Sequence, residues 1–135
     1  GWGGGGGGSA VVRAKRGGTV AECFTGEACK EMSTRGSRWR GGVDWAIREF
    51  GFPLYCNRLG ARGEHVFQSS APHTGREAAE AADFELEQYI HLRLLNDGFL
   101  LTPFHNMALM SPATNASDVD AHSQAFRKMC ADLVA

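Results

Sequence analysis

The sequence predicts a small α/β (α+β) domain in which short strands pack with three helices. Three segments carry apolar residues at helical spacing, and the two stretches between them have the pattern of paired short strands. The chain has 135 residues, of which 43% are hydrophobic and 21% are charged. That size and balance suit one domain with a single core.

The first expected helix covers residues 25–50. Thr25 is placed to cap its beginning, and Gly51 with Pro53 ends it. Apolar residues recur along one face at Ala28, Met32, Trp39, Val43, Ile47 and Phe50.

Short strands are expected on both sides of the second helix. Residues 54–59 and 62–68 precede it and are joined at Gly60, while residues 99–102 and 107–110 follow it. These runs are too short to be core helices, so they predict a small sheet.

The second and last helices are predicted from capping patterns. Thr74 and Glu77 have capping-box spacing, and the helical pattern then continues to Gly98. Ser117 and Asp120 resemble a second capping box. The helix after it carries on one face Val119, His122, Phe126, Met129 and Leu133.

The sequence predicts a flexible glycine-rich lead-in over residues 1–18 and one domain over residues 19–135. A glycine run has high backbone entropy and no side chains to bury. Glycine amides can also wrap a phosphate, but such a loop needs a preceding strand and a following Gly-Lys-Ser/Thr, and both are missing.

Charge and cysteine patterns exclude several classes of protein. Fourteen basic and fifteen acidic residues give a net charge of −1, without the clustered basic excess that nucleic-acid binding needs. Arg35, Arg38 and Arg40 lie among acidic residues and predict a solvated helix face. No apolar run is long enough to predict a membrane span. The four cysteines lack zinc-site spacing, and we expect reduced thiols, no metal site and a cytoplasmic protein.

Three blocks of the sequence resemble successive blocks of one enzyme family. They are residues 58–64 (RLGARGE), 89–98 (YIHLRLLNDG) and 101–112 (LTPFHNMALMSP). The family is the class III pyridoxal-phosphate (PLP) aminotransferases, in the branch that includes the glutamate-1-semialdehyde aminomutases. The resemblance covers about residues 20–134, and it implies the C-terminal small domain of the type I PLP fold.

In that family the cofactor lysine, its acidic partner and the phosphate-binding turn belong to a separate large domain. The lysines here are Lys15, Lys30 and Lys128. Lys15 is closely followed by glycines, but no acidic residue precedes Glu22 and only a few residues separate Lys15 from the first helix. The resemblance therefore implies PLP in the complete parent enzyme, none held by this chain alone, and no catalytic residue in it.

The resemblance places residues 102–110 at the mouth of the active site. It implies substrate contacts from Thr102, His105 and Asn106, with Arg62 as the remaining anion contact. In the alternative interpretation His105 caps a turn, Asn106 satisfies loop backbone and Arg62 pairs with a nearby acid.

Two departures weaken any choice of substrate. The family's carboxylate-binding arginine is replaced by residues of the run 108–110, and the aminomutase carboxylate is replaced by Met107.

The resemblance implies the C-terminal part of an aminotransferase or aminomutase that acts on amino acids or amino-keto compounds and is inactive alone. Its partners would be the large PLP-binding domain and a small amino substrate, in a homodimeric parent. The sequence offers more large apolar side chains than the core of this domain needs, so some are expected at the surface that the large domain covers. The candidates, some of which must form the core itself, are Trp39, Trp45, Phe99, Leu101, Phe104, Met107 and Met110. The alternative is a free-standing small α/β binding or interaction module.

Overall fold

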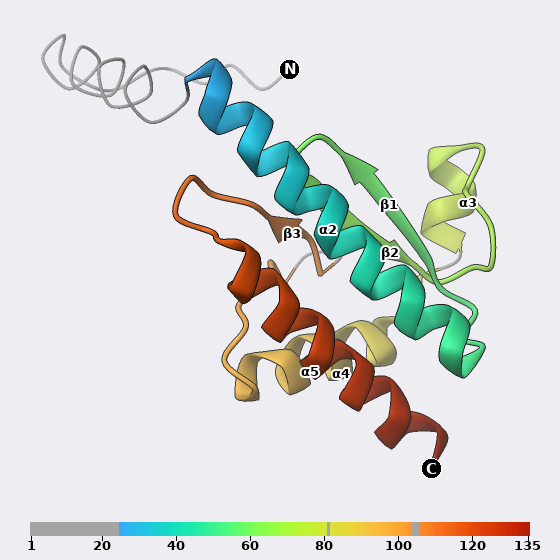
Figure 1. The fold of residues 1–135 in the computed structure, drawn as a ribbon. Helices are drawn as coiled ribbons and strands as arrows, with labels where there is room; N and C mark the ends of the chain where they lie inside the picture. The colour runs from blue at the N-terminus through green and yellow to red at the C-terminus, as the bar shows by residue number, and fades with distance from the viewer. Residues whose placement is uncertain (1–24, 81, 104–105) are drawn as a thin grey trace, which may run out of the picture.

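The computed structural model describes residues 25–80, 82–103 and 106–135. The lead-in expected over residues 1–18 lies outside these residues. Figure 1 shows a layered arrangement in which α2 and α5 lie side by side, with the sheet against α2 and α4 against α5. The elements are α2 (Gly26–Phe50), β1 (Tyr55–Leu59), β2 (Arg62–Val66), α3 (Gly75–Glu80), α4 (Phe84–Asn96), β3 (Ala108–Leu109) and α5 (Ala116–Val134).

Helix α2 confirms the first helix expected from the sequence. The Thr25 hydroxyl accepts a hydrogen bond from the Ala28 amide at 3.1 Å, which caps the helix. Gly51 ends it in the left-handed conformation, with φ of 67°. The buried face carries Met32, Gly36, Trp39, Val43, Ala46 and Ile47.

The strands form one antiparallel sheet in the order β1-β2-β3. β1 and β2 meet at a tight turn in which Gly60 has φ of 60°, as the expected hinge requires. β3 lies within the predicted run 107–110. Residues 99–102 do not form the expected strand, because this stretch leads from α4 into the loop before β3.

The second expected helix is two helices, which corrects the prediction of one continuous segment. The Glu77 amide donates to the Thr74 hydroxyl at 3.2 Å, as the capping pattern predicted, and opens α3. Asp83 then caps α4, its carboxylate accepting from the Leu86 amide at 3.0 Å. An aspartate at this position competes with continuous helix because its side chain satisfies the amides of a new first turn.

The last helix begins two residues earlier than predicted. Asn115, rather than Ser117, is the N-cap, and it exchanges hydrogen bonds with Asp118 in a capping box. Asp120, the expected partner in the box, instead pairs with Arg38 of α2 through two contacts, the second of which is 2.8 Å.

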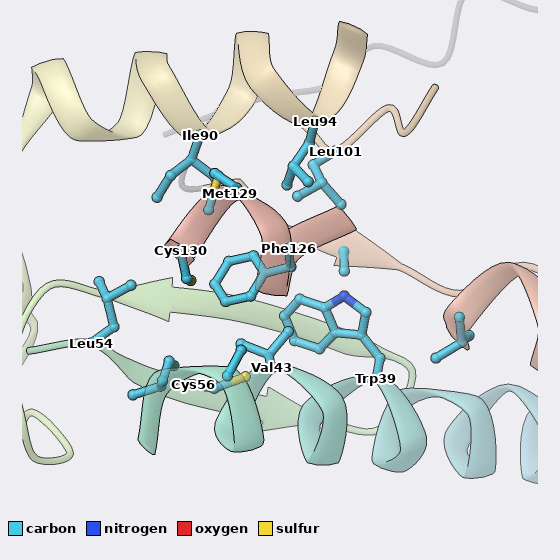
Figure 2. Close-up of a cluster of buried hydrophobic side chains, with 14 residues drawn as sticks. Trp39, Val43, Leu54, Cys56, Ile90, Leu94, Leu101, Phe126, Met129 and Cys130 are labelled. Carbon is cyan, nitrogen blue, oxygen red and sulfur yellow. The ribbon is translucent and has the colours of Figure 1, made fainter. Parts of the chain in front are cut away.

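One hydrophobic core lies between the three long helices and the sheet. Figure 2 shows Trp39 and Val43 of α2 pointing toward Phe126 of α5, while Ile90 and Leu94 of α4 approach Met129 from the other side. Trp39 and Leu101 are 1% and 6% exposed. Trp39 and Leu101 are therefore among the candidates that form the core of the domain, whereas Trp45 is 55% exposed.

Within the described residues, no helix is long and apolar enough to cross a membrane. In the same part of the chain, no group of three or more His, Cys, Asp or Glu side chains is placed to hold a metal ion.

Candidate functional site

Two hydrogen bonds between Thr102 and Met107 close the segment that follows α4. The Thr102 amide donates to the Met107 carbonyl at 3.1 Å, and the Met107 amide donates to the Thr102 hydroxyl at 3.1 Å. After β3 the Met110 amide donates to the Ala61 carbonyl at 2.9 Å. Thr102 and Met107 are thus held together at the two ends of the loop, and the chain after β3 is held to the sheet through Met110. His105, a predicted site residue, lies outside the described residues.

Asn106 ties this loop to helix α4. Its side-chain amide donates to the Glu87 carbonyl at 2.9 Å, and the residue is 1% exposed. Its φ is 44°, a left-handed conformation that asparagine tolerates better than most residues. The buried side-chain oxygen has no hydrogen-bond partner among the described residues. The buried Asn106 side chain therefore holds the loop against α4.

Arg62 lies on the sheet, beside the strand into which the loop leads. One terminal nitrogen of its guanidinium is 2.9 Å from a carboxylate oxygen of Glu64, and the side chain is 52% exposed. The amide of Asn57 donates to the other oxygen of Glu64 at 3.4 Å. The salt bridge between Arg62 and a nearby acid, which was the alternative interpretation of the sequence, is therefore present. The guanidinium has further N–H donors that can bind an anion. A hollow of about 110 Å³ is lined here by Asn57, Arg58, Leu59, Arg62 and Glu64.

The described site residues thus lie in two different places, the loop before β3 and the surface of the sheet. Thr102 and Asn106 shape one loop, and Asn106 faces α4. Arg62 is on the surface of the sheet, opposite Leu109 of β3 in the strand register.

A buried histidine pair was not recognised as such in the sequence. His65 and His122 are 3% and 4% exposed, and their ring nitrogens have no hydrogen-bond partner among the described residues. His65 stacks on Phe126 at 5.1 Å between ring centroids, and Trp39 lies 5.4 Å from His65. Burial lowers the pKa of His65 to about 3, with a smaller effect from His122, and burial lowers the pKa of His122 to about 4. In the sequence, the burial of His122 was indicated by its position on the apolar face of the last helix.

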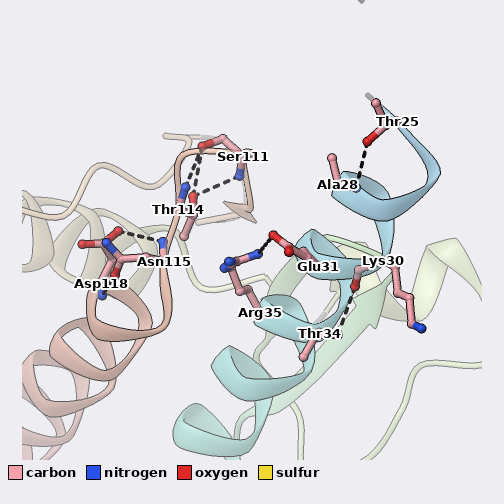
Figure 3. Close-up of polar contacts among 10 residues, drawn as sticks. All are labelled: Thr25, Ala28, Lys30, Glu31, Thr34, Arg35, Ser111, Thr114, Asn115 and Asp118. Carbon is pink, nitrogen blue, oxygen red and sulfur yellow. Dashed lines mark hydrogen bonds and ion pairs between the residues drawn. The ribbon is translucent and has the colours of Figure 1, made fainter. Parts of the chain in front are cut away.

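The described lysines do not fit a PLP site. Figure 3 shows the Lys30 side chain extending away from the helix, and Lys30 and Lys128 are both exposed. The groove beside Lys30, of about 420 Å³, carries charges of both signs, and Arg35 there pairs with Glu31 at 3.0 Å. A cofactor lysine is instead held in a closed site with groups that bind phosphate and the ring nitrogen. Neither Lys30 nor Lys128 lies in such a closed site.

No family model matches the sequence, and no curated protein sequence matches it. Solved structures do. A glutamate-1-semialdehyde aminomutase variant from Pseudomonas aeruginosa in complex with PMP is 40% identical, with a TM-score of 0.88, over 93% of this chain and 28% of that chain. A second structure of an aminomutase of that name from the same organism is 42% identical, with a TM-score of 0.82, over 85% and 25% of the two chains.

An omega-transaminase from Sphaerobacter thermophilus shares the fold at 19% identity and a TM-score of 0.69, over 82% of this chain and 25% of that chain. The chain spans about a quarter of the length of the structures it matches.

Proposed function

Because this chain belongs to the class III PLP aminotransferases, in the branch of the glutamate-1-semialdehyde aminomutases, we propose that it is the C-terminal small domain of such an enzyme. The parent would be a transaminase or aminomutase acting on amino acids or amino-keto compounds. One observation carries the proposal: 40% identity over 93% of this chain, against only 28% of the matched one.

The proposed cofactor of the parent is PLP. One similar aminomutase was solved with PMP, and a transaminase of the same fold was solved with PLP bound. PLP, when bound, withdraws electrons from the carbon that carries the amino group. Since Lys30 and Lys128 are exposed on helices, we assign the cofactor to the large domain, outside this chain. On this proposal the chain alone is inactive.

We assign the substrate side of this domain to Arg62, Thr102, His105 and Asn106. The half-exposed guanidinium of Arg62 suits a substrate carboxylate, since it retains unused donors beside Glu64. Thr102 and Asn106 hold the loop in shape through their bonds to Met107 and to the Glu87 carbonyl. A direct substrate contact stays a prediction for each of the four, and the burial of Asn106 favours a supporting role for it.

The remaining assignments concern the whole parent. We propose that it works in the cytoplasm as a homodimer, in which this domain closes over a small amino substrate bound beside the large domain.

A cofactor-trapping experiment tests the assignment of PLP to the large domain. The chain is incubated with PLP, reduced with borohydride and digested for mass spectrometry. We expect no specific pyridoxyl group on Lys15, Lys30 or Lys128, whereas a Pseudomonas aeruginosa aminomutase with its cofactor lysine intact, treated in parallel, should be modified at one lysine. A stoichiometric adduct at one lysine of this chain would show that it holds the cofactor itself, and the free-standing module would then be favoured.

A further inference from the structure

A cavity of about 210 Å³ lies between the segment that leads out of α4, strand β3 and the first turns of α5. An apolar cavity of about 150 Å³ holds benzene in another protein, so this one has room for a single ring with a small substituent. Arg62, Thr102 and Asn106, which we assign to the substrate side, do not line it. The cavity is therefore separate from the described part of the proposed substrate site.

The lining of the cavity is largely apolar and aromatic. Phe99 and Leu101 come from the segment after α4, Val119 comes from α5, and Trp39 comes from α2. Figure 2 shows the indole nitrogen of Trp39 on the side of its ring that faces Leu101. A ring-shaped ligand would thus meet the kind of surface that small-molecule sites usually present.

Two buried lining residues carry polar atoms that the rest of the described chain does not satisfy. Trp39 and His122 are 1% and 4% exposed and both line the cavity. The indole nitrogen of Trp39 and both ring nitrogens of His122 have no hydrogen-bond partner among the described residues. The two ring centroids are 5.9 Å apart. Because buried polar groups nearly always have a partner, this pair indicates a ligand that supplies one.

A hydroxyl group matches the hydrogen-bonding groups of both rings. Burial lowers the pKa of His122 to about 4, so at neutral pH the ring carries one donor nitrogen and one acceptor nitrogen. The Trp39 indole can only donate. One hydroxyl can accept from Trp39 and donate to His122, whereas a methyl group of similar size can do neither.

The charge beside the cavity disfavours an anionic ligand. The lining residues include the exposed Asp118, whose carboxylate accepts from the Asn115 amide at 2.9 Å. Figure 3 shows this bond at the beginning of α5. The described lining residues include no lysine or arginine that would neutralise the carboxylate. A negatively charged ligand would therefore be repelled there.

We propose that this cavity binds a small uncharged aromatic molecule that carries one hydroxyl group. Its ring packs on the apolar lining, and its hydroxyl bonds to Trp39 and His122. The site lies within one domain and uses residues of this chain alone. It goes beyond the proposed function, and its test does not depend on the parent enzyme.

A titration of the isotopically labelled chain with phenol at neutral pH tests this site. Nuclear magnetic resonance follows the indole N–H signals of Trp39, in the cavity lining, and of Trp45, which is 55% exposed and does not line it. We expect a saturable shift of the Trp39 signal and none of the Trp45 signal. Toluene, which has the same ring without the hydroxyl, should bind at least about fivefold more weakly, because two hydrogen bonds are lost. Benzoate should give no saturable shift, because it is an anion.

Two histidine variants provide a matched control. His122→Leu removes the acceptor from the cavity lining, and His65→Leu removes a histidine that is 3% exposed and does not line the cavity. We expect phenol to bind His122→Leu at least about fivefold more weakly and His65→Leu within about twofold of the unaltered chain. Circular dichroism melting first establishes that both variants are folded.

Several outcomes would overturn the site. They are a Trp39 signal that phenol does not shift saturably, toluene or benzoate that binds as tightly as phenol, and equal weakening of phenol binding by the two substitutions. If His122→Leu does not fold, the comparison of phenol with toluene on the unaltered chain decides the question by itself.

Discussion

Acid should destabilise this domain as the pH falls below about 6.5. The cause is the buried pair His65 and His122, whose rings lie among Trp39, Phe99 and Phe126. Their pKa values are about 3 and about 4 in the folded chain, against an ordinary 6.5. As the pH falls below 6.5, the unfolded chain takes up protons that the folded chain does not. The histidine contribution is therefore complete above about pH 6.5 and is lost as the pH falls from there toward the folded pKa values.

The magnitude follows from the proton difference. Because the unfolded chain takes up one proton at each of the two histidines, the free energy of unfolding falls by up to about 3 kcal/mol per pH unit in this window. Over two units the loss approaches about 5 kcal/mol, which is comparable to the whole stability of a small domain. The carboxylates of Glu49 and Asp120 have lowered pKa values because of hydrogen bonds from Arg127 and Arg38, so their contribution is lost at lower pH.

Urea unfolding at a series of pH values between about 7 and about 5 measures this slope. The control variants His65→Leu and His122→Leu each remove one titrating ring while keeping an apolar side chain. Each should reduce the slope by about half, whatever its effect on stability at neutral pH. A free energy of unfolding that does not change across this range would refute the reasoning, as would a slope that neither substitution alters.

Three further predictions concern the stability of the domain. Gly63→Ala should cost about 1–3 kcal/mol in urea unfolding because its methyl group overlaps the indole ring beneath it, whereas Gly41→Ala, which meets nothing within 4 Å, should stabilise α2 by about 0.5–1 kcal/mol. Leu94→Ala empties a fully buried position and should cost about 2–5 kcal/mol, while Leu92→Ala on the outer side of the same helix should cost far less. Deleting residues 1–9 should leave the melting temperature unchanged, because a glycine run offers almost no side chain to bury. Equal effects within either pair, or a lower melting temperature after the deletion, would contradict these expectations.

Helix and strand positions with local signals were predictable from the sequence. Thr25 and Gly51 bound α2 because a hydroxyl cap and a left-handed glycine act within one turn of the chain. Gly60 marked the turn of the hairpin for the same reason. The choice between competing caps was not predictable in this way. Asn115 and Ser117 can both cap a helix, and packing of α5 on α2 favours the earlier start, since Asp120 then pairs with Arg38.

Long-range placement accounts for the other differences. Trp39 and Leu101 are as apolar as exposed interface residues would be, and only the fold determines that they meet in the core while Leu59 and Leu109 remain outside. The contacts of the site residues likewise depend on the fold and could not be predicted from the local sequence. The sequence places Thr102 and Asn106 in one segment, but the bond from Asn106 to the Glu87 carbonyl depends on where α4 packs.

A chimeric enzyme tests the central claim, that this chain is the small domain of a PLP aminotransferase or aminomutase. In it, this chain replaces the segment of an active Pseudomonas aeruginosa aminomutase that it matches over 93% of its length. The measurement is cofactor content and turnover of the purified chimera with the amino substrates of the recipient enzyme, which is assayed in parallel. We predict a chimera that retains PLP and turns over substrate. A folded chimera that binds PLP as the recipient does but shows no turnover on any amino substrate would contradict the claim.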